Sequence, residues 1–457
     1  MLKINSSIFK AYDIRGIYGQ DFDNELGRLL GLAFVSLRQS DPDHVPGKKL
    51  KIAVGADMRL SSPGLKASLI KGLNEAGADA IDLGVISTPG LYFAVGFWNY
   101  DGGIIVSASH NPKEWNGFKL VRAKGVPISG ETGMEFLKEK VLENRFLPAA
   151  ESGQTTENHE VLEEQIKHSL KFADIAAIKP LKVVADTANG MGATYLEALA
   201  QHLPLELIKL NFQLDGSFPA HEADPLKPEN LKQLQTEILR HKADLGLATD
   251  GDGDRIFFVD DSGRTIDPAL VRGLLSRIFL KDKPGAKIGY DVRPGKITLD
   301  LIAEAGGQPV VTRVGHSLIK EQMIKEDIYF AGESSGHFYL NETIGCFEYP
   351  PVMILKLLAE FSASGRKISE YVSPYSRYFA SGEINRTVED KELVFAKIIE
   401  RYPEGKINRL DGVSIECPDF WFNVRGSNTE PKMRLNLEAI DQATMEKRRD
   451  EILELMK

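Results

Sequence analysis

Three segments of the sequence share one pattern: a short β-rich run that ends on aspartate and a loop, a helical stretch, and a second β-rich run. The first runs are KIAVGAD, KVVAD and KIGYD, and they begin at Lys51, Lys182 and Lys287. Strand, loop and helix recur in any α/β protein, so independent occurrence is the alternative to repetition. We interpret the pattern as a diverged repeat of one α/β domain.

The sequence changes character towards its end. The β-rich runs GEINRTV, INRLDGVSIEC, FWFNVRG and MRLNLEAI accompany helical stretches at 390–402 and 442–456, which is an α+β pattern. A polar, glycine-containing stretch at 148–160 offers little apolar surface and indicates a link between domains. We therefore expect four domains, three alike and one different, with bounds at 1–155, 156–258, 259–370 and 371–457.

Length and composition agree with a multidomain globular protein. The 457 residues exceed what one core usually supports. Lysine and arginine total 56 against 65 acidic residues, and a net charge of -9 argues against nucleic acid or anionic membranes as partners. Cys346 and Cys417 are far apart and indicate neither a disulfide framework nor a zinc cluster. The chain start lacks a signal-peptide core, and a cytoplasmic location is expected.

The stretch IIVSASHNPKEWNGFK carries a serine just past an apolar run. Ser109 precedes Asn111 and Pro112, and proline disfavours helical backbone in the residue before it. We therefore expect the hydroxyl at a strand end, where α/β proteins form their sites. The ammonium groups of Lys113 and Lys119 suit an anionic ligand or a phosphorylated serine. An ordinary serine in a tight turn is the alternative.

The stretch LGLATDGDGDRIFFVDD places three aspartates after an apolar run, at Asp250, Asp252 and Asp254. The alternating glycines let the backbone turn, so the carboxylates are expected to converge on one hard cation such as Mg²⁺. An EF-hand loop needs glycine and glutamate where this chain has Arg255 and Asp261, and a helix where it has a β-rich run. Aspartate-glycine turn chemistry without a metal is the other alternative.

Two further loops carry polar side chains that suit a phosphosugar. YFAGESSGHFYL combines a carboxylate, hydroxyls and an imidazole between glycines, groups that pair with sugar hydroxyls. NVRGSNTEPKMRL offers a guanidinium, hydroxyls and backbone N–H groups for a phosphate. For each loop alone, a polar surface turn is the alternative. Together with the serine and aspartate loops, they give each predicted domain one piece of phosphosugar chemistry.

The motifs FKAYDIRG, SASHNP, DGDGDR, GESSGH and RGSNTEP occur in this order along essentially the whole chain. In this set the sequence resembles the α-D-phosphohexomutases, and within them the bacterial phosphomannomutase/phosphoglucomutase group. The resemblance implies three similar α/β domains with mixed sheets around a central cleft. It also implies a smaller C-terminal α+β domain of TATA-binding-protein-like fold.

The resemblance assigns roles to individual residues. The implied catalytic residues are Ser109, which is phosphorylated, His110, Lys119 and His316. The implied Mg²⁺ ligands are the phosphate on Ser109 and the carboxylates of Asp250, Asp252 and Asp254. The implied substrate-binding residues are Tyr12, Arg15, Arg255, Arg293, Gly315, Glu333, Ser335, His337, Arg425, Ser427, Asn428 and Thr429.

The resemblance also implies a reaction. A phosphoserine gives its phosphoryl group to a hexose phosphate, a hexose 1,6-bisphosphate forms, and the other phosphate returns to the serine after the intermediate turns over. The net change interconverts hexose 1-phosphate and hexose 6-phosphate, with mannose or glucose as the sugar. Transfer of this kind needs positioning and charge neutralisation, which Mg²⁺, Lys119 and Arg255 would supply.

Some positions depart from the family pattern. Arg293 stands where relatives often have lysine, and arginine stays charged, so we assign it to ligand binding only. The proton carrier is left open among Lys119, His110 and His316. Ser334 and the segment IGCFEYPP differ from dual-specificity enzymes, which leaves the sugar open.

Two other functions compete with the mannose and glucose reading. They are phosphoglucosamine mutase activity and a non-catalytic sugar-phosphate sensor. In every case the expected partners are small phosphosugars, and the expected assembly is a monomer or weak dimer.

Overall fold

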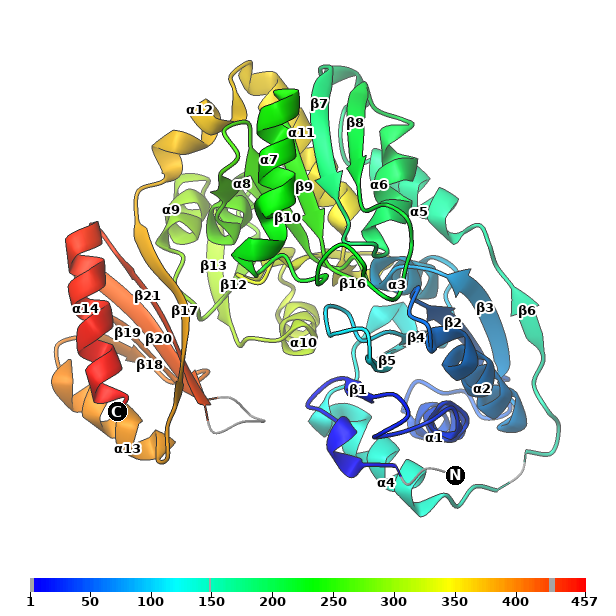
Figure 1. Cartoon of the computed structure of the whole chain (residues 1–457). Coiled ribbons are helices and arrows are strands. Elements are labelled where there is room, and N and C mark those ends of the chain that lie inside the picture. The colour runs from blue at the N-terminus through cyan, green and yellow to red at the C-terminus, as the bar shows by residue number, and fades with distance from the viewer. Residues whose placement is uncertain (1–3, 148, 427–431) are drawn as a thin grey trace. The chain divides into compact units, whose positions relative to one another are not determined.

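The computed structural model describes residues 4–147, 149–426 and 432–457. The chain forms two compact units (Figure 1). The first unit comprises Met1–Thr265 and His337–Ser369, and the second comprises Ile266–Gly336 and Glu370–Lys457. Within the described residues, no helix combines the length and apolarity needed to span a bilayer.

The first unit begins with a six-stranded sheet in the order β1-β5-β4-β2-β3-β6. Strand β2 pairs in parallel with β3 and β4, and β5 returns antiparallel between β4 and β1, so the sheet is mixed. The strands are β1 (Ile14–Ile17), β2 (Lys51–Ala56), β3 (Asp79–Val85), β4 (Gly102–Val106), β5 (Trp115–Arg122) and β6 (Thr155–Glu157). The helices are α1 (Glu25–Ser40), α2 (Ser62–Glu75), α3 (Thr88–Phe97) and α4 (Glu135–Glu143).

Helices α1 and α2 pack closely because glycine stands at their contact. A Cβ atom at Gly31 would lie 2.7 Å from the Leu69 carbonyl oxygen, and one at Gly72 would lie 2.0 Å from that of Arg28. The buried side chains of α1, α2 and the sheet form one apolar core. This core supports the carboxyl ends of β2 and β4, where polar loops begin.

The next part of the first unit contains a second mixed sheet, with β7 pairing in parallel with β8 and β9 and with β10 antiparallel to β9. Its strands are β7 (Leu181–Asp186), β8 (Leu205–Leu210), β9 (Leu245–Thr249) and β10 (Ile256–Asp260), followed by β11 (Thr265–Ile266). Its helices are α5 (Val161–Leu170), α6 (Gly192–Ala200) and α7 (Lys232–His241). The antiparallel strands β15 (Phe338–Glu342) and β16 (Gly345–Glu348) and the helix α11 (Pro350–Ser364) also belong to this unit.

The second unit begins with α8 (Pro268–Asp282), followed by a third parallel arrangement. Strand β12 pairs in parallel with β13 and β14. The strands are β12 (Lys287–Asp291), β13 (Gln308–Thr312) and β14 (Phe330–Gly332), and the other helices are α9 (Lys296–Glu304) and α10 (His316–Glu326). Helix α12 (Ile368–Val372) precedes the C-terminal region.

The predicted repeat is confirmed by strand order and by the turn after each first strand. Strands β2, β7 and β12 each lie between two parallel neighbours. Each ends beside an aspartate that accepts a hydrogen bond from the amide two residues on, at 3.0 Å for Asp57, 3.0 Å for Asp186 and 3.1 Å for Asp291. Such aspartate turns release the chain from the strand into the following loop and helix.

The C-terminal region is the predicted α+β domain. Its sheet has the order β17-β21-β20-β19-β18, all antiparallel, and Figure 1 shows α14 across one face. The strands are β17 (Phe379–Thr387), β18 (Lys406–Asn408), β19 (Val413–Glu416), β20 (Phe420–Gly426) and β21 (Lys432–Ala439). The helices are α13 (Lys391–Arg401) and α14 (Gln442–Leu455), and their apolar faces share one core with the sheet.

Candidate active site

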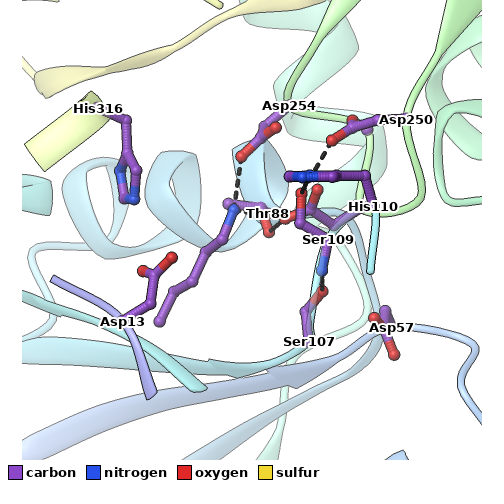
Figure 2. A network of polar contacts seen from close by, with 12 residues as sticks. Asp13, Asp57, Thr88, Ser107, Ser109, His110, Asp250, Asp254 and His316 are labelled. Atoms are coloured by element: carbon purple, nitrogen blue, oxygen red, sulfur yellow. Dashed lines mark hydrogen bonds and ion pairs between the residues drawn. The ribbon is translucent and has the colours of Figure 1, made fainter. Parts of the chain in front are cut away.

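Ser109 lies in the loop after β4, and its conformation is unusual for a serine. Its φ angle is +52°, in the left-handed region, and its amide donates to Ser107 Oγ at 2.9 Å. Its hydroxyl donates to Asp250 Oδ2 at 2.9 Å, as Figure 2 shows. The serine predicted at a strand end therefore contacts the aspartate loop, although the two are far apart in sequence.

The three aspartates lie on the loop between β9 and β10, and the strand before the loop excludes the EF-hand alternative. All are fully buried. One carboxylate oxygen from each of Asp250, Asp252 and Asp254 lies within 4.8 Å of the other two. The carboxylates therefore converge, as predicted.

The chemistry of this cluster fits a divalent cation. Burial, and the charges of Asp254 and Asp252, raise the pKa of Asp250 well above its ordinary value. Asp252 Oδ1 is buried without a hydrogen-bond partner among the residues that the structure describes. Carboxylate oxygens are ligands for hard cations such as Mg²⁺, and three of them converge here, so these residues fit the predicted ion.

Lys119 lies on β5 and reaches the aspartate loop. Its Nζ lies 2.6 Å from Asp252 Oδ2 and 2.6 Å from Asp254 Oδ2. Burial alone would lower the pKa of Lys119, but these two carboxylates raise it well above its ordinary value. The side chain is therefore an ammonium group, and its positive charge contacts two of the three carboxylates.

His110 follows Ser109 and points its ring to the serine. Its Nδ1 lies 3.3 Å from Ser109 Oγ. Burial, and the positive charges of Arg255 and Arg15, hold the pKa of His110 well below its ordinary value. A neutral imidazole therefore lies beside the hydroxyl at neutral pH.

Arg255 and His337 extend the aspartate cluster. The Arg255 amide donates to Asp250 Oδ1 at 3.2 Å, and its guanidinium lies 3.7 Å from Asp250 Oδ2. Arg255 and His337 form an isolated antiparallel bridge. His337 Nε2 lies 3.1 Å from Asp254 Oδ1. An imidazole predicted to contact sugar therefore contacts a predicted metal ligand.

The N-terminal motif also reaches the serine loop. Strand β1 places Arg15 opposite Gly117 of β5. The Arg15 guanidinium donates to Asn111 Oδ1 at 2.9 Å and to Asp13 Oδ2 at 2.6 Å. Tyr12 is half-buried beside it. The structure thus brings Arg15 to the loop that contains Ser109.

Thr88 is a site residue that sequence reasoning did not find. It lies at the start of α3 and donates its hydroxyl to Asp252 Oδ2 at 2.6 Å. None of the motifs identified in the sequence includes it. Its amide donates to the Asp252 carbonyl at 3.1 Å. The sequence signal, serine before threonine and proline, predicts only a helix start, and packing of the fold gives it this second contact.

The second unit holds the other predicted ligand-binding groups. Arg293 Nη2 lies 2.5 Å from Asp291 Oδ2 and 3.1 Å from Glu333 Oε1. Glu333 also accepts from the Gly315 amide at 3.1 Å and from Ser335 Oγ at 2.8 Å. Three predicted residues therefore gather around the carboxylate of a fourth, Glu333. His316, the fifth in this region, begins α10 and is buried.

The C-terminal sheet contributes a second arginine. Arg425, on β20, lies 3.0 Å from Glu383 Oε2 on β17. Burial would raise the pKa of Glu383, but Arg425, Arg434 and Arg293 lower it. The Glu383 partner was not predicted. Three other predicted phosphate-binding residues lie outside the described residues: Ser427, Asn428 and Thr429.

Comparisons with known proteins agree with this arrangement. Models of the phosphoglucomutase/phosphomannomutase family match its alpha/beta/alpha domain I at residues 6–147, domain II at 163–263, domain III at 269–378 and the C-terminal domain at 383–455. Together they span most of the chain. The chain therefore belongs to the phosphoglucomutase/phosphomannomutase family, whose members are intramolecular phosphotransferases.

Similar proteins come from distant organisms. A phosphomannomutase of Escherichia coli is 38% identical, with 98% of this chain and 99% of the relative covered. A phosphomannomutase of Methanocaldococcus jannaschii is 38% identical, with 98% and 97% covered. The crystal structure of a phosphoglucomutase/phosphomannomutase family protein of Burkholderia thailandensis has a TM-score of 0.89 at 30% identity, with 99% and 98% covered.

Proposed function

We propose that this enzyme interconverts hexose 1-phosphate and hexose 6-phosphate, with mannose or glucose as the sugar. The reaction proceeds through a phosphoserine at Ser109 and a hexose 1,6-bisphosphate. The observation that carries the proposal is the contact of Ser109 Oγ with Asp250 inside a cluster of three buried carboxylates. The names of the E. coli and M. jannaschii relatives favour mannose phosphates.

The chemical step exchanges one phosphorus–oxygen bond for another. The bond between phosphorus and Ser109 Oγ breaks as phosphorus bonds to the free hydroxyl oxygen of the sugar phosphate. That hydroxyl loses its proton, and the freed Ser109 Oγ gains one. In the second half, the other phosphate of the bisphosphate returns to Ser109. No oxidant, reductant or water is consumed, so substrate and product are isomers.

Charge neutralisation is the task of the residues around Ser109. Asp250, Asp252 and Asp254 would hold Mg²⁺, which supplies Lewis-acid stabilisation of the phosphoryl oxygens. Lys119 and Arg255 add fixed positive groups beside the same loop. These charges stabilise the negative oxygens of the transferring group without moving during the step.

The proton carrier remains one of three residues. His110 Nδ1 lies 3.3 Å from Ser109 Oγ, within reach of the proton at the reacting oxygen. Lys119 contacts two of the carboxylates, and His316 begins α10 next to Gly315. We propose that proton transfer falls to one of them and that Arg293 only binds ligand.

Binding is proposed for the remaining predicted groups. In the second unit, Glu333, Ser335, Gly315 and Arg293 are suited to sugar hydroxyls, since together they offer donors and acceptors. The proposed phosphate-binding residues are Arg425, Ser427, Asn428 and Thr429. In the first unit, the proposed ligand contacts are Tyr12, Arg15, Arg255 and His337. The domain bounds are proposed at 1–155, 156–258, 259–370 and 371–457.

The test compares turnover of mannose, glucose and glucosamine 1-phosphates with Mg²⁺ and a trace of the matching bisphosphate. We expect turnover of the mannose or glucose compound, and its loss in Ser109→Ala. The matched control is Ser169→Ala, because Ser169 is a buried serine of α5 that donates to the Gln165 carbonyl at 2.6 Å. Faster turnover of the glucosamine compound would move the proposal to a phosphoglucosamine mutase. No turnover of any compound would refute it.

A further inference from the structure

Arg59 lies in the loop between β2 and α2, and its guanidinium is surrounded by backbone carbonyls. The side chain is 0% exposed. Nη2 donates to the carbonyls of Ser109 at 2.8 Å and Asn111 at 2.6 Å. Nη1 donates to those of Pro112 at 2.8 Å and Trp115 at 2.9 Å. One side chain therefore binds four carbonyls of the loop that begins at the proposed nucleophile.

The backbone of Ser109 needs such support. A φ of +52° is unfavourable for a residue with a Cβ atom, and it persists only where the surroundings fix it. Ser107 Oγ holds the Ser109 amide, and Arg59 holds its carbonyl. Gly251 packs closely on the same carbonyl: a Cβ atom at this position would lie 2.4 Å from the Ser109 carbonyl oxygen. Three contacts thus fix the peptide groups on both sides of the serine.

Arg59 is itself rigidly placed. Its amide donates to Asp57 Oδ1 at 3.0 Å, and its Nε lies 3.2 Å from Asp57 Oδ2. Ser62 Oγ donates to the same carboxylate at 2.7 Å. On the other side, the ring of Phe218 lies with its centroid 5.0 Å from the guanidinium carbon. Contacts on both sides therefore hold the guanidinium in place.

We propose that Arg59 is a positioning residue for Ser109: by holding the carbonyls of residues 109, 111, 112 and 115, it fixes the serine hydroxyl against Asp250. It contacts no reacting atom and acts through the backbone of the loop. This inference rests on the proposed function of Ser109. The fork geometry is essential, because two terminal nitrogens point to two carbonyls each, whereas a lysine has its three donors on a single atom.

The competing explanation is that Arg59 is only one more buried arginine that stabilises the fold. Arg38 provides the matched control, because it is 2% exposed and lies in the same sheet domain. Its guanidinium donates to the Asp101 carbonyl at 2.9 Å and to Asp43 Oδ2 at 2.9 Å, and it also pairs with Asp41. Both arginines are buried and hydrogen-bonded, but only Arg59 touches the serine loop.

The experiment compares Arg59→Lys with Arg38→Lys in the full-length protein. Misplacement of a reacting group by about 1 Å costs on the order of 100-fold in rate. We expect Arg59→Lys to lower kcat by about 100-fold while KM changes less than about threefold. Arg38→Lys is expected to lower Tm at least as much and to leave kcat within about threefold. A general loss of stability would not produce this split.

Amide hydrogen exchange gives a second readout that does not depend on turnover. The Asn111 amide donates to the Ala108 carbonyl at 3.0 Å, and the Ser109 amide donates to Ser107. Arg59→Lys is expected to accelerate exchange of the amides of residues 109 and 111, and Arg38→Lys is expected to leave them unchanged.

The two readouts separate failure of this inference from failure of the proposed function. If the wild-type protein lacks mutase turnover, the proposed function fails, and loop exchange alone still supports or overturns the positioning role. If the wild-type protein is active, equal kcat and equal loop exchange in the two lysine variants would overturn the inference. Rescue of Arg59→Ala activity by added guanidinium would strengthen it.

Discussion

The turns after β2 and β12 have the same local structure and opposite surroundings. In each, an aspartate accepts from the amide of an arginine two residues on, Asp57 from Arg59 and Asp291 from Arg293. Arg59 is 0% exposed and its guanidinium binds backbone carbonyls. Arg293 is 10% exposed and faces the carboxylates of Asp291 and Glu333.

This difference shows how a repeated turn takes on two tasks. The partners of Arg59 are backbone carbonyls of the serine loop, so the first turn has a structural role. Carboxylate partners also bind hydroxyls, so the groups around Arg293 can exchange their contacts for those of a ligand. Burial opposes the charge, but Asp291 and Glu333 raise the pKa of Arg293 above its ordinary value, so it stays a cation. The first turn supports the loop of the proposed nucleophile, and the third is suited to binding.

The largest effect on kcat should come from removing the positive charge of Lys119, which contacts the aspartates in the same unit as the first turn. Lys119→Met removes the ammonium group between Asp252 and Asp254, and kcat is expected to fall by about 1,000-fold, equivalent to about 4 kcal/mol. Lys66→Met is the control, because Lys66 Nζ lies 2.6 Å from Asp82 Oδ1 and contacts none of the three aspartates. Steady-state rates check this, and a loss below tenfold would contradict the assignment.

The second-largest effect should come from metal binding, which is expected at the aspartate loop and not at the third turn. Saturating Mg²⁺ is expected to stabilise the protein by about 2.7 kcal/mol at 100 times its Kd, because it binds only the folded cluster. Asp252→Asn should abolish the rise in Tm on adding Mg²⁺. Asp291→Asn changes an equally buried aspartate of the third turn, and the Mg²⁺-dependent rise should survive. Thermal unfolding with Mg²⁺ and with a chelator measures both.

The binding role of the third turn predicts a smaller change of a different kind. Arg293→Lys keeps the charge and loses the fork between Asp291 and Glu333, so KM should rise by about tenfold, or about 1.4 kcal/mol, with kcat nearly unchanged. Arg59→Lys should show the reverse split. If both variants change kcat alone, the two turns do not differ in the way we describe.

The turn after β7, the second of the three, tests the comparison through the free energy of unfolding. Asp186 Oδ2 lies 3.0 Å from His221 Nε2, and this contact raises the pKa of His221, although burial opposes it. A raised folded pKa gives stability that is present below about pH 6.5 and lost as pH rises through the folded value. His221→Gln should therefore cost at most about 1 kcal/mol at pH 5.5 and little at pH 9. Equal costs at the two pH values in denaturant unfolding would contradict it.

Local patterns in the sequence were sufficient to predict the repeat and the serine and aspartate loops, and the family resemblance supplied the other residues of the candidate site. Strand, aspartate and helix recur with a readable period, and Ser109 and the three aspartates stand at strand ends in short motifs. The aspartate-x-arginine pattern of the first and third turns was equally visible, but it does not tell which partners the arginine meets.

The contacts between distant segments could not be predicted. Thr88 reaches Asp252 from the start of α3, and Glu383 reaches Arg425 across β21. Such contacts depend on how elements pack, and threonine at a helix start or glutamate on an edge strand has no sequence signal that names its partner. Arg59 was missed for the same reason, since its partners are backbone carbonyls that every sequence contains.

The most direct test of the account is the location of the phosphoryl group during turnover. Purified protein is treated with Mg²⁺ and a limiting amount of hexose 1,6-bisphosphate, then mixed with mannose 6-phosphate and sampled by peptide mass spectrometry. We predict one phosphoryl group on Ser109 that disappears at the rate of turnover as bisphosphate forms. Turnover with Ser109 unmodified, or with the group on another residue, would contradict the account.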